Sequence, residues 1–400
     1  MAACLNIEVL MNNTIRISHI SAGFTAVLVG YTSSIVIIIQ AATALGASAQ
    51  QTESWLLALG LAMGLSSIGL SWYYKTPLLT AWSTPGAAML AGASFNYEMP
   101  VILGAFVTTG AMVFLTGLIR PFRDVLQNVP PAIATAMLAA ILLPFCLSSF
   151  AIAESDTLSF VLMFSGFLLA KRFVPKYAMA ILLLLALIIT FNGVNGFGIG
   201  LDGQGISTEL AQPVWITPEF DWLAVLNLSL PLYLVTMLSQ NLPGIAMLKS
   251  FQYQAPVKPV LLGTGLTNML TAPLGGFSLN LAAISAAICM TSDVDTDPKQ
   301  RYKAVLWAGL FYLLAGIFAT TVVNLFLAMP GEVIKMLAGF ALLGTLLMCL
   351  QSSFSDVTAR ESAILTFLFT LSGIQLLGLN SILWGLIVGI VHLKFMKSSD

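Results

Sequence analysis

Twelve long stretches of this chain contain no Asp, Glu, Lys or Arg, and this feature constrains the fold more than any other. A helix that crosses a bilayer needs about 20 predominantly apolar residues. The stretches cover residues 17–52, 54–74, 76–97, 99–119, 125–153, 157–170, 177–201, 222–248, 259–292, 304–331, 336–355 and 362–393. Two of them, 259–292 and 362–393, are long enough to cross twice, and each contains a Gly-rich break. We therefore predict fourteen transmembrane segments in an all-α polytopic membrane protein.

The composition agrees with this class and excludes others. Of the 400 residues, 58% are apolar and 8% charged, whereas an ordinary soluble domain has about 25% charged residues. The formal charge of -1 leaves no basic excess for a nucleic-acid partner. The four cysteines have no metal-ligand spacing, so we expect neither a metal site nor a cofactor. The first twenty residues lack an apolar core followed by a small-residue cleavage site, and we expect no cleaved signal peptide.

The basic residues predict the orientation. With fourteen segments and both termini in the cytoplasm, all of the sixteen Lys and Arg residues except Lys335 fall on the cytoplasmic side. An excess of Lys and Arg in cytoplasmic loops is the usual signature of membrane topology. The pattern therefore favours a multi-pass protein with both termini inside.

Seven segments in each half mean that an internal repeat must be inverted, and the sequence carries weak traces of one. Residues 116–132 resemble residues 323–331, and the third segment of each half is broken near its middle. The breaks lie at Trp82-Ser83-Thr84-Pro85-Gly86 and at Pro273-Leu274-Gly275-Gly276-Phe277-Ser278. Matching interruptions in two halves are the best sequence indication of a transporter binding site. We expect 7+7 inverted repeats with broken helices in segments 3 and 10.

Each break predicts the start of a short helix. Thr84 followed by Pro85 has the pattern of an N-cap with proline at the first helical position. Ser278 is expected to cap a second helix that runs to about Met290. Two helix N-termini that point at one spot near the midplane would suit an anion. The alternative is that both breaks are only packing kinks.

Polar residues in two other segments extend the candidate site. The first segment contains Tyr31 and Ser33, and the eighth contains Gln240 beside Asn241. Side-chain amides in a bilayer indicate either a cavity wall or a contact between helices, and both interpretations stay open. Hydroxyl groups can also bond back to their own helix.

The charged and titratable residues give no proton carrier. The charge-free stretches contain no carboxylate, lysine or arginine by construction, so no buried acid is available as an obvious proton carrier at membrane depth. We interpret His19 and His392 as interfacial residues, and Asp293, Asp295 and Asp297 as part of a solvated cytoplasmic loop.

Four segments together resemble a known family. Residues 19–42, 75–86, 239–244 and 272–288 are similar to the benzoate:proton symporter family of bacterial inner membranes, and the resemblance covers essentially the whole chain. The family implies the fold of the uracil transporter and the anion-exchanger superfamily. By that analogy residues 20–124 and 222–328 form a core domain, and residues 125–200 and 329–397 form a gate domain.

The resemblance also implies a substrate. Nucleobase members of the superfamily carry a glutamate in the eighth and tenth segments, but this chain has Ser239-Gln240-Asn241 and Phe277-Ser278-Leu279-Asn280 there. That difference argues against nucleobases and fits a substrate that brings its own negative charge. The family implies uptake of a small aromatic carboxylate with a proton across the inner membrane, and it leaves room for a homodimer.

The resulting hypothesis is a secondary transporter for benzoate or a similar aromatic acid. Its predicted substrate-binding residues come from segments 1, 3, 8 and 10, and they are Tyr31, Ser33, Ser83, Thr84, Gly86, Gln240, Asn241, Gly276, Phe277, Ser278 and Asn280. An uncoupled anion channel or exchanger, or a transporter of another small organic anion, remains an alternative. An enzyme is not expected, because no converging catalytic groups are present.

Overall fold

The computed structural model describes residues 16–92, 97–119, 130–192 and 210–397. Within these ranges the secondary structure is helical, apart from two three-residue strands and one isolated bridge. The prediction of an all-α fold is therefore wrong in one detail, since the breaks in segments 3 and 10 contain paired strands. The predicted repeat positions 120–129, the basic residues Arg120 and Arg123, and most of the N-terminal segment lie outside the described residues.

The elements fall into two halves of the chain. Those of the first half are α2 (Ile17–Thr32), α3 (Ile35–Ala44), α4 (Ala49–Tyr74), β1 (Thr80–Trp82), α5 (Thr84–Gly92), α6 (Met99–Leu118), α8 (Pro131–Ser155), α9 (Thr157–Phe173), η1 (Pro175–Tyr177) and α10 (Ala178–Asn192). Those of the second half are α11 (Trp222–Ala224), η3 (Val225–Ser229), α12 (Leu230–Thr236), η4 (Met237–Asn241), α13 (Leu242–Ser250), α14 (Val257–Thr271), η5 (Ala272–Leu274), β2 (Leu279–Leu281), α15 (Ile284–Ile288), η6 (Pro298–Gln300), α16 (Tyr302–Ile317), α17 (Ala319–Leu327), α18 (Gly331–Ser355), α19 (Arg360–Leu371) and α20 (Ser381–Lys397).

Several helices are long and apolar enough to cross a membrane. Six such helices occur in the described ranges, and they are Ile17–Ala44, Ala49–Tyr74, Met99–Leu118, Pro131–Ser155, Trp222–Ser250 and Gly331–Ser355. A seventh is added if Pro298–Ile317 and Ala319–Leu327, which are bent by 61°, count as one span. The protein is thus a polytopic, mostly helical membrane protein. The count of fourteen segments stays a prediction, because the remaining helices are shorter or broken.

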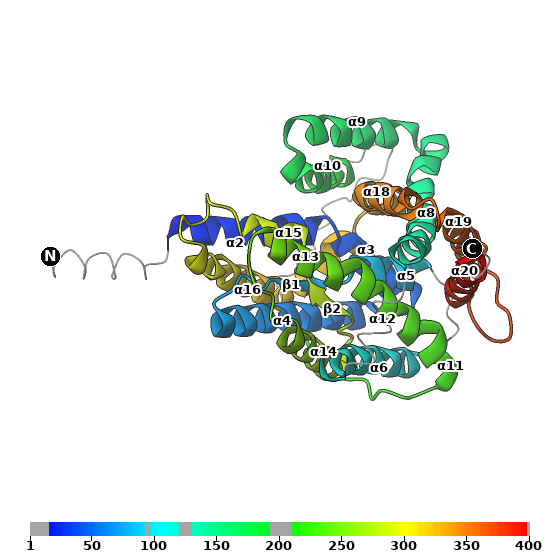
Figure 1. Cartoon of the computed structure of the whole chain (residues 1–400). Coiled ribbons are helices and arrows are strands. Elements are labelled where there is room, and N and C mark those ends of the chain that lie inside the picture. Colours follow the sequence, from blue (N-terminus) through cyan, green and yellow to red (C-terminus); the bar gives the residue numbers. More distant parts are fainter. Residues whose placement is uncertain (1–15, 93–96, 120–129, 193–209, 398–400) are drawn as a thin grey trace, which may run out of the picture.

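Helices from the two halves of the chain lie side by side (Figure 1). Helix α4 packs along α16, α6 along α14 and α8 along α18. In the view of Figure 1, α8 to α10 and α18 to α20 lie together at the top and right, and the other helices form a larger group. Helices α3 and α5 lie where the two groups meet, and α5 contacts α8.

Glycines allow the paired helices to approach closely. A Cβ atom on Gly60 of α4 would lie 2.6 Å from the Cα of Gly316 on α16. On the next pair, a Cβ on Gly265 of α14 would lie 2.5 Å from the backbone nitrogen of Phe114 on α6. Small residues at helix contacts are typical of membrane proteins, where association depends on close van der Waals packing.

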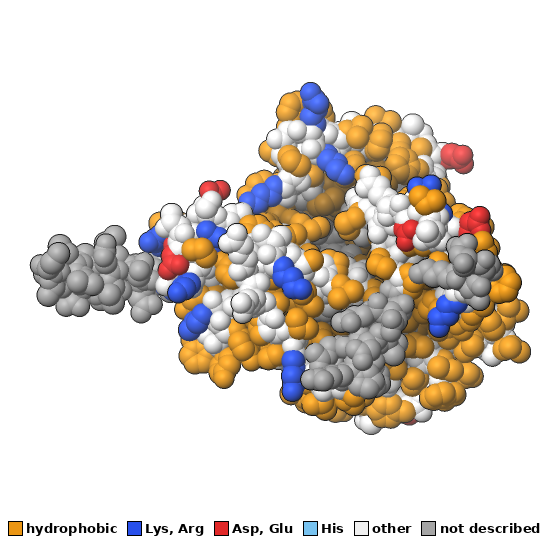
Figure 2. All heavy atoms as spheres, viewed as in Figure 1, with side chains coloured by type: hydrophobic (Ala, Val, Ile, Leu, Met, Phe, Trp, Pro, Cys, Tyr) orange, Lys and Arg blue, Asp and Glu red, His pale blue; other side chains and the backbone are white. Residues whose placement is uncertain are grey.

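The surface agrees with a lipid environment. Figure 2 shows apolar side chains over much of the visible face, with several acidic and basic side chains near the end where α2 begins and others scattered at the top and right. Large apolar residues on α9, such as Leu168, Leu169 and Phe173, are more than half exposed. On a soluble protein, large apolar side chains exposed together on one helix would need a partner to cover them. Here the acyl chains of lipids can cover them.

Candidate functional site

Two short strands cross inside the protein, and we call them, with Ser83 and Ser278, the strand crossing. Strands β1 and β2 pair antiparallel, with Ala81 opposite Asn280. The N–H of Ser83 donates to the carbonyl of Ser278 at 2.9 Å, which extends the pairing by one residue. Backbone groups at membrane depth must find partners within the protein. The pairing therefore allows both segments to leave the helical conformation there.

Helix α5 begins at the strand crossing, one residue earlier than predicted. The hydroxyl of Ser83 accepts a hydrogen bond from the N–H of Gly86 at 3.1 Å, so Ser83 is the capping residue. Thr84 is the first helical residue and Pro85 the second, and the prediction of Thr84 as the cap is wrong by one position. Pro85 has no N–H, and Gly86 and Ala87 both donate to Ser83, so the partial positive charge at the start of this nine-residue helix comes from the helix dipole and the Thr84 N–H.

The second predicted short helix is largely wrong. Residues 279–281 form β2, and helix α15 begins only at Ile284 and is five residues long. Ser278 has a positive φ of 33° and does not cap a helix. Pairing with β1 satisfies these backbone groups as a helix would, and no local pattern of residues indicates that partner. The two halves thus meet as paired strands rather than as two equal helix ends.

The turn before β2 depends on a glycine. Gly275 has a φ of 94°, and a Cβ atom there would lie 1.7 Å from the Trp55 ring. Gly276 is similarly enclosed, since a Cβ would lie 2.4 Å from the hydroxyl of Thr271. The Gly-Gly pair therefore lets the chain turn against α4 and enter the strand crossing.

The eighth predicted segment braces β2 through an amide. Asn241 is fully buried, its Oδ1 accepts the N–H of Leu281 at 3.1 Å, and its Nδ2 lies 3.2 Å from the sulfur of Met237. This residue is thus a contact between segments, one of the two alternatives considered above. The neighbouring Gln240 is half-buried, on the wide π-helical turn η4. Wide turns of this kind are frequent at functional sites.

Three buried polar atoms around the strand crossing have no hydrogen-bond partner. They are the Ser278 hydroxyl, Asn280 Oδ1 and the Tyr31 hydroxyl. The Asn280 side chain is held by its Nδ2, which donates to the Leu281 carbonyl at 3.0 Å. A buried polar group without a partner costs about 1–3 kcal/mol. These atoms therefore indicate hydrogen-bonding capacity that is available to a ligand.

Sequence reasoning missed two further atoms of this kind. Gln40 Oε1 and the Thr236 hydroxyl are buried without partners, on α3 and α12. Both residues lie on helices that pack on α5. The polar run at residues 30–40 contained the signal for Gln40, but Thr236 stands in an apolar sequence that gave none.

The first predicted segment breaks at its polar run and contacts the strand crossing. Helix α2 ends at Thr32 and α3 starts at Ile35, and Ser33 bonds back to the Gly30 carbonyl at 3.0 Å. The Trp82 indole donates to the Ser34 hydroxyl at 2.7 Å, and its ring centroid lies 5.1 Å from that of Tyr31. Trp82 and Ser34 are therefore part of the site, although the sequence-based set omits both.

Phe277 lies elsewhere than expected. Its ring is fully buried and packs against Trp55 and Phe106, at centroid distances of 6.1 Å and 5.6 Å. The aromatic partner of Tyr31 is instead Trp82. Phe277 is among the predicted substrate-binding residues because of its place in the sequence, and the turn at Gly275 directs its ring into the packing against α4 and α6.

Near the strand crossing the site residues are uncharged. Strands β1 and β2 and helices α5 and α15 contain no acidic or basic residue. A separate cavity of about 340 Å³ lies at the other end of α5, where Gly92, Asn227 and Asn380 are among its lining residues. None of the predicted site residues lines that cavity. Among the described residues, no group of three or more His, Cys, Asp or Glu residues could hold a metal ion.

Two titratable residues are more buried than the sequence suggests. His19 lies near the start of α2, as expected for a residue at the edge of the first segment, but its side chain is fully buried against Asp295. Asp295 is only 4% exposed and so does not belong to a solvated loop. Sequence spacing could not reveal this contact, since 276 positions separate the two residues.

Comparison with known proteins identifies the family. The sequence profile of the benzoate membrane transport protein family, BenE, matches residues 13–395. The chain belongs to this family. It is 40% identical over 372 residues to the inner membrane protein YdcO of Escherichia coli strain K12, covering 92% of this chain and 93% of that protein. It is 36% identical over 370 residues to the benzoate membrane transport protein of Acinetobacter baylyi, with the same coverage.

Solved structures show the same fold at low sequence identity. The transmembrane domain of the cyanobacterial bicarbonate transporter BicA matches with a TM-score of 0.57 at 13% identity, covering 94% of this chain and 96% of that one. SLC26A9 matches with a TM-score of 0.63 at 12% identity over 95% of this chain, which spans 65% of the SLC26A9 chain. The resemblance to the BenE family is thus confirmed, and the protein is a membrane transporter rather than an enzyme.

Proposed function

We propose that this BenE family member takes up benzoate or a similar aromatic carboxylate, together with one proton, across the bacterial inner membrane. The observation that carries the proposal is the 36% identity to a benzoate membrane transport protein over 92% of the chain. The relative YdcO is named as an inner membrane protein, which supports the same location. We further propose fourteen segments as 7+7 inverted repeats with both termini in the cytoplasm.

The chemistry of the strand crossing supports an anionic substrate. The substrate carboxylate would lie between the start of α5 and Ser278, where Ser83, Thr84 and Gly86 begin a helix without a nearby acid. The unpaired Ser278 hydroxyl is a suitable donor. Charge-assisted hydrogen bonds of this kind are about twice as strong as neutral ones. An aromatic body would then lie toward Tyr31 and Trp82.

Proton coupling follows from the energetics of uptake. Bringing one negative charge into a negative interior costs about 2.3 kcal/mol per 100 mV. Taking up one proton with each carboxylate moves no net charge and removes that cost. In the proposed cycle, the core domain (residues 20–124 and 222–328) moves against the gate domain (residues 125–200 and 329–397).

Uptake of labelled benzoate into proteoliposomes tests the proposal. We expect protein-dependent accumulation under an inward proton gradient, loss of accumulation when the gradient is collapsed, and competition by other aromatic acids but not by uracil. Empty vesicles are the control, because protonated benzoic acid crosses lipid unaided. Equilibration without accumulation would instead indicate an uncoupled channel or exchanger, and competition by aliphatic acids alone would indicate another organic anion.

A further inference from the structure

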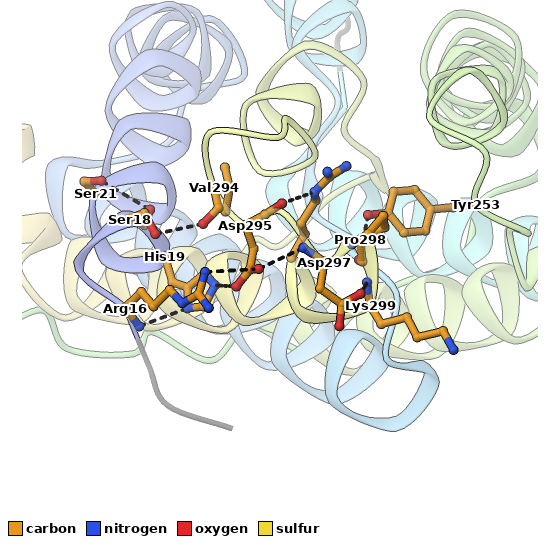
Figure 3. A network of polar contacts seen from close by, with 11 residues as sticks. Arg16, Ser18, His19, Ser21, Tyr253, Val294, Asp295, Asp297, Pro298 and Lys299 are labelled. Carbon is orange, nitrogen blue, oxygen red and sulfur yellow. Dashed lines mark hydrogen bonds and ion pairs between the residues drawn. The ribbon is translucent and has the colours of Figure 1, made fainter. Parts of the chain in front are cut away.

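A second buried polar cluster lies where α2 begins and where the chain continues beyond α15 (Figure 3). His19 of α2 is fully buried, and its Nε2 lies 2.9 Å from Oδ2 of Asp295. The Asp295 side chain is 3% exposed. We call His19, Arg16 and Asp295 the His19 cluster. It is separate from the strand crossing, and the transport cycle described above does not use it.

The hydrogen bonds determine the protonation state of the imidazole. Nδ1 of His19 accepts the backbone N–H of Arg16 at 3.1 Å, so that nitrogen carries no proton. Nε2 must then carry the proton, and it donates a hydrogen bond to the carboxylate of Asp295. His19 is therefore neutral in this arrangement. It occupies the third helical position and bonds back to the capping residue, as Glu or Gln does in a capping box.

Asp295 is held as a fixed anion beside this neutral ring. Burial works to raise the pKa of its carboxyl, but the backbone N–H of Asp297 at 3.0 Å, His19 and Arg16 together hold that pKa below its usual value. The Arg16 guanidinium lies 3.4 Å from Oδ1. Asp295 thus stays ionised at neutral pH, and His19 is the member of the pair that can change its charge.

The charged groups around His19 come from three elements. Arg16 precedes α2, Asp295 follows α15, and Lys303 on α16 is nearly buried and also acts on the ring. Helices α10 and α15, which also pack on α2, contain no charged residue. One anion and two cations therefore face the imidazole.

Adding a proton to His19 would break one of its two contacts. The proton would enter at Nδ1, the only free ring nitrogen, and would turn an acceptor into a donor that faces the Arg16 N–H. Two donors at 3.1 Å repel each other, so the Arg16 backbone must move away. The first turn of α2 then loses the hydrogen bond from the Arg16 N–H to the His19 ring, while the attraction to Asp295 increases.

The cluster joins the two segments that form the strand crossing. Within helix α2, His19 and Tyr31 are separated along the helix axis by about 18 Å at 1.5 Å per residue. The segment with Asp295 follows β2 and α15, and the Ser18 hydroxyl adds a second link by donating to the Val294 carbonyl at 2.7 Å. A change at the start of α2 can thus reach both sides of the candidate substrate site.

We propose that His19 is a proton-binding site, and that a lower pH on the side of the membrane where α2 begins slows transport. The proposal rests on the proposed function, in which each cycle delivers an acid equivalent to that side. With His19 neutral, the start of α2 is capped and transport proceeds. A proton from that side uncaps α2, which provides feedback on uptake of the acid.

Exchange of labelled benzoate at equal pH on both sides of the vesicles tests the site without a driving gradient. We expect wild-type, protein-dependent exchange to fall about fivefold or more as the pH is lowered from about 7.5 to about 5, with most of the fall below the ordinary imidazole value of about 6.5, because burial, Lys303 and Arg16 oppose the added proton. His19→Gln keeps a donor and an acceptor but cannot be charged. This variant should exchange normally at neutral pH and lose most of the acid inhibition.

Two further variants sharpen the result. His392→Gln changes the other histidine, which lies on α20 and hydrogen-bonds with Ser362 on α19. This variant should keep the wild-type pH profile. Asp295→Asn removes the anion that stabilises protonated His19, and should move the inhibition to lower pH. A wild-type profile in His19→Gln would overturn the proposal, and so would an unchanged profile in Asp295→Asn if the glutamine variant does not fold.

Nuclear magnetic resonance separates this proposal from the proposed function. The chain has two histidines, so ¹⁵N-histidine labelling gives two imidazole rings that His392→Gln assigns. We expect His19 to be protonated at Nε2 alone at neutral pH and to gain a proton on acidification, with a parallel shift of the Arg16 amide. If the wild type moves no benzoate at any pH, the proposed function fails and this titration alone decides about His19. A doubly protonated ring at neutral pH, or no titration down to about pH 5, overturns the site.

Discussion

The strand crossing and the His19 cluster are both buried and polar, but they differ in charge and in hydrogen bonding. At the strand crossing, Ser278 and Asn280 are uncharged and each has a polar atom without a partner. In the His19 cluster, both ring nitrogens and both carboxylate oxygens are paired. Polar atoms without hydrogen-bond partners suit a region that receives a ligand. Fully paired polar atoms that include a titratable group suit a region that holds two segments together.

The largest expected effect concerns the left-handed turn at Gly275, which leads the chain into the strand crossing. Gly275→Ala places a Cβ at a left-handed φ and against Trp55. The expected loss of stability is roughly 2–5 kcal/mol, from about 1–2 for the left-handed conformation and about 1–3 for overpacking. Thermal unfolding in detergent measures this loss of stability. Gly344→Ala on α18 is the control, because a Cβ atom there would have no neighbouring atom within 4 Å. Equal stability of the two variants would contradict the role of this turn.

A second prediction concerns the absence of charge at the strand crossing. Asn280→Asp adds a carboxylate beside the proposed anion site, and we expect benzoate affinity to fall by more than about 100-fold, because like charges in a buried site repel strongly. Equilibrium binding of labelled benzoate to purified protein measures this. Asn324→Asp on α17 serves as a control for adding an acid elsewhere, and an equal loss in both variants would count against the site.

A smaller effect is expected from removing one unpaired hydroxyl. Ser278→Ala should weaken benzoate binding about tenfold, since a hydrogen bond to a charged group contributes about 1.5–3 kcal/mol. Stability should stay equal or rise, because the buried hydroxyl has no partner in the protein. Ser149→Ala is the matched control, since that hydroxyl is also buried but donates to the Cys146 carbonyl. That variant should lose stability and keep its affinity, and the opposite pattern would reverse our assignment.

The smallest expected effect concerns the charge of Asp295. Because its pKa is lowered in the folded protein, the ionised carboxyl contributes stability that is present at neutral pH and is lost as the pH falls through that pKa. We expect Asp295→Asn to lower the unfolding temperature at about pH 7, and this difference should shrink only below about pH 3.9, as the pH falls through the lowered pKa. Measuring both proteins in the His19→Gln background removes the titration of the imidazole. A difference that does not depend on pH would contradict the ion-pair interpretation.

The sequence by itself determined the membrane class, the positions of the two breaks and the family. These properties depend on local composition, since a charge-free stretch of about 20 residues has few alternatives to a membrane helix. Residues Tyr31, Ser83, Asn241, Ser278 and Asn280 could be proposed because polar residues are conspicuous in apolar segments. The family resemblance then gave the transporter class that the comparisons confirm.

Only the tertiary structure decided how those residues meet. The strand pairing of Asn280 with Ala81 needs a partner 199 positions away, so local pattern favoured a helix in its place. The same limit hid the contact of Trp82 with Ser34, the burial of Phe277 against Trp55, and the pairing of His19 with Asp295. Each depends on which elements pack together, and that information is not present in any single stretch of the sequence.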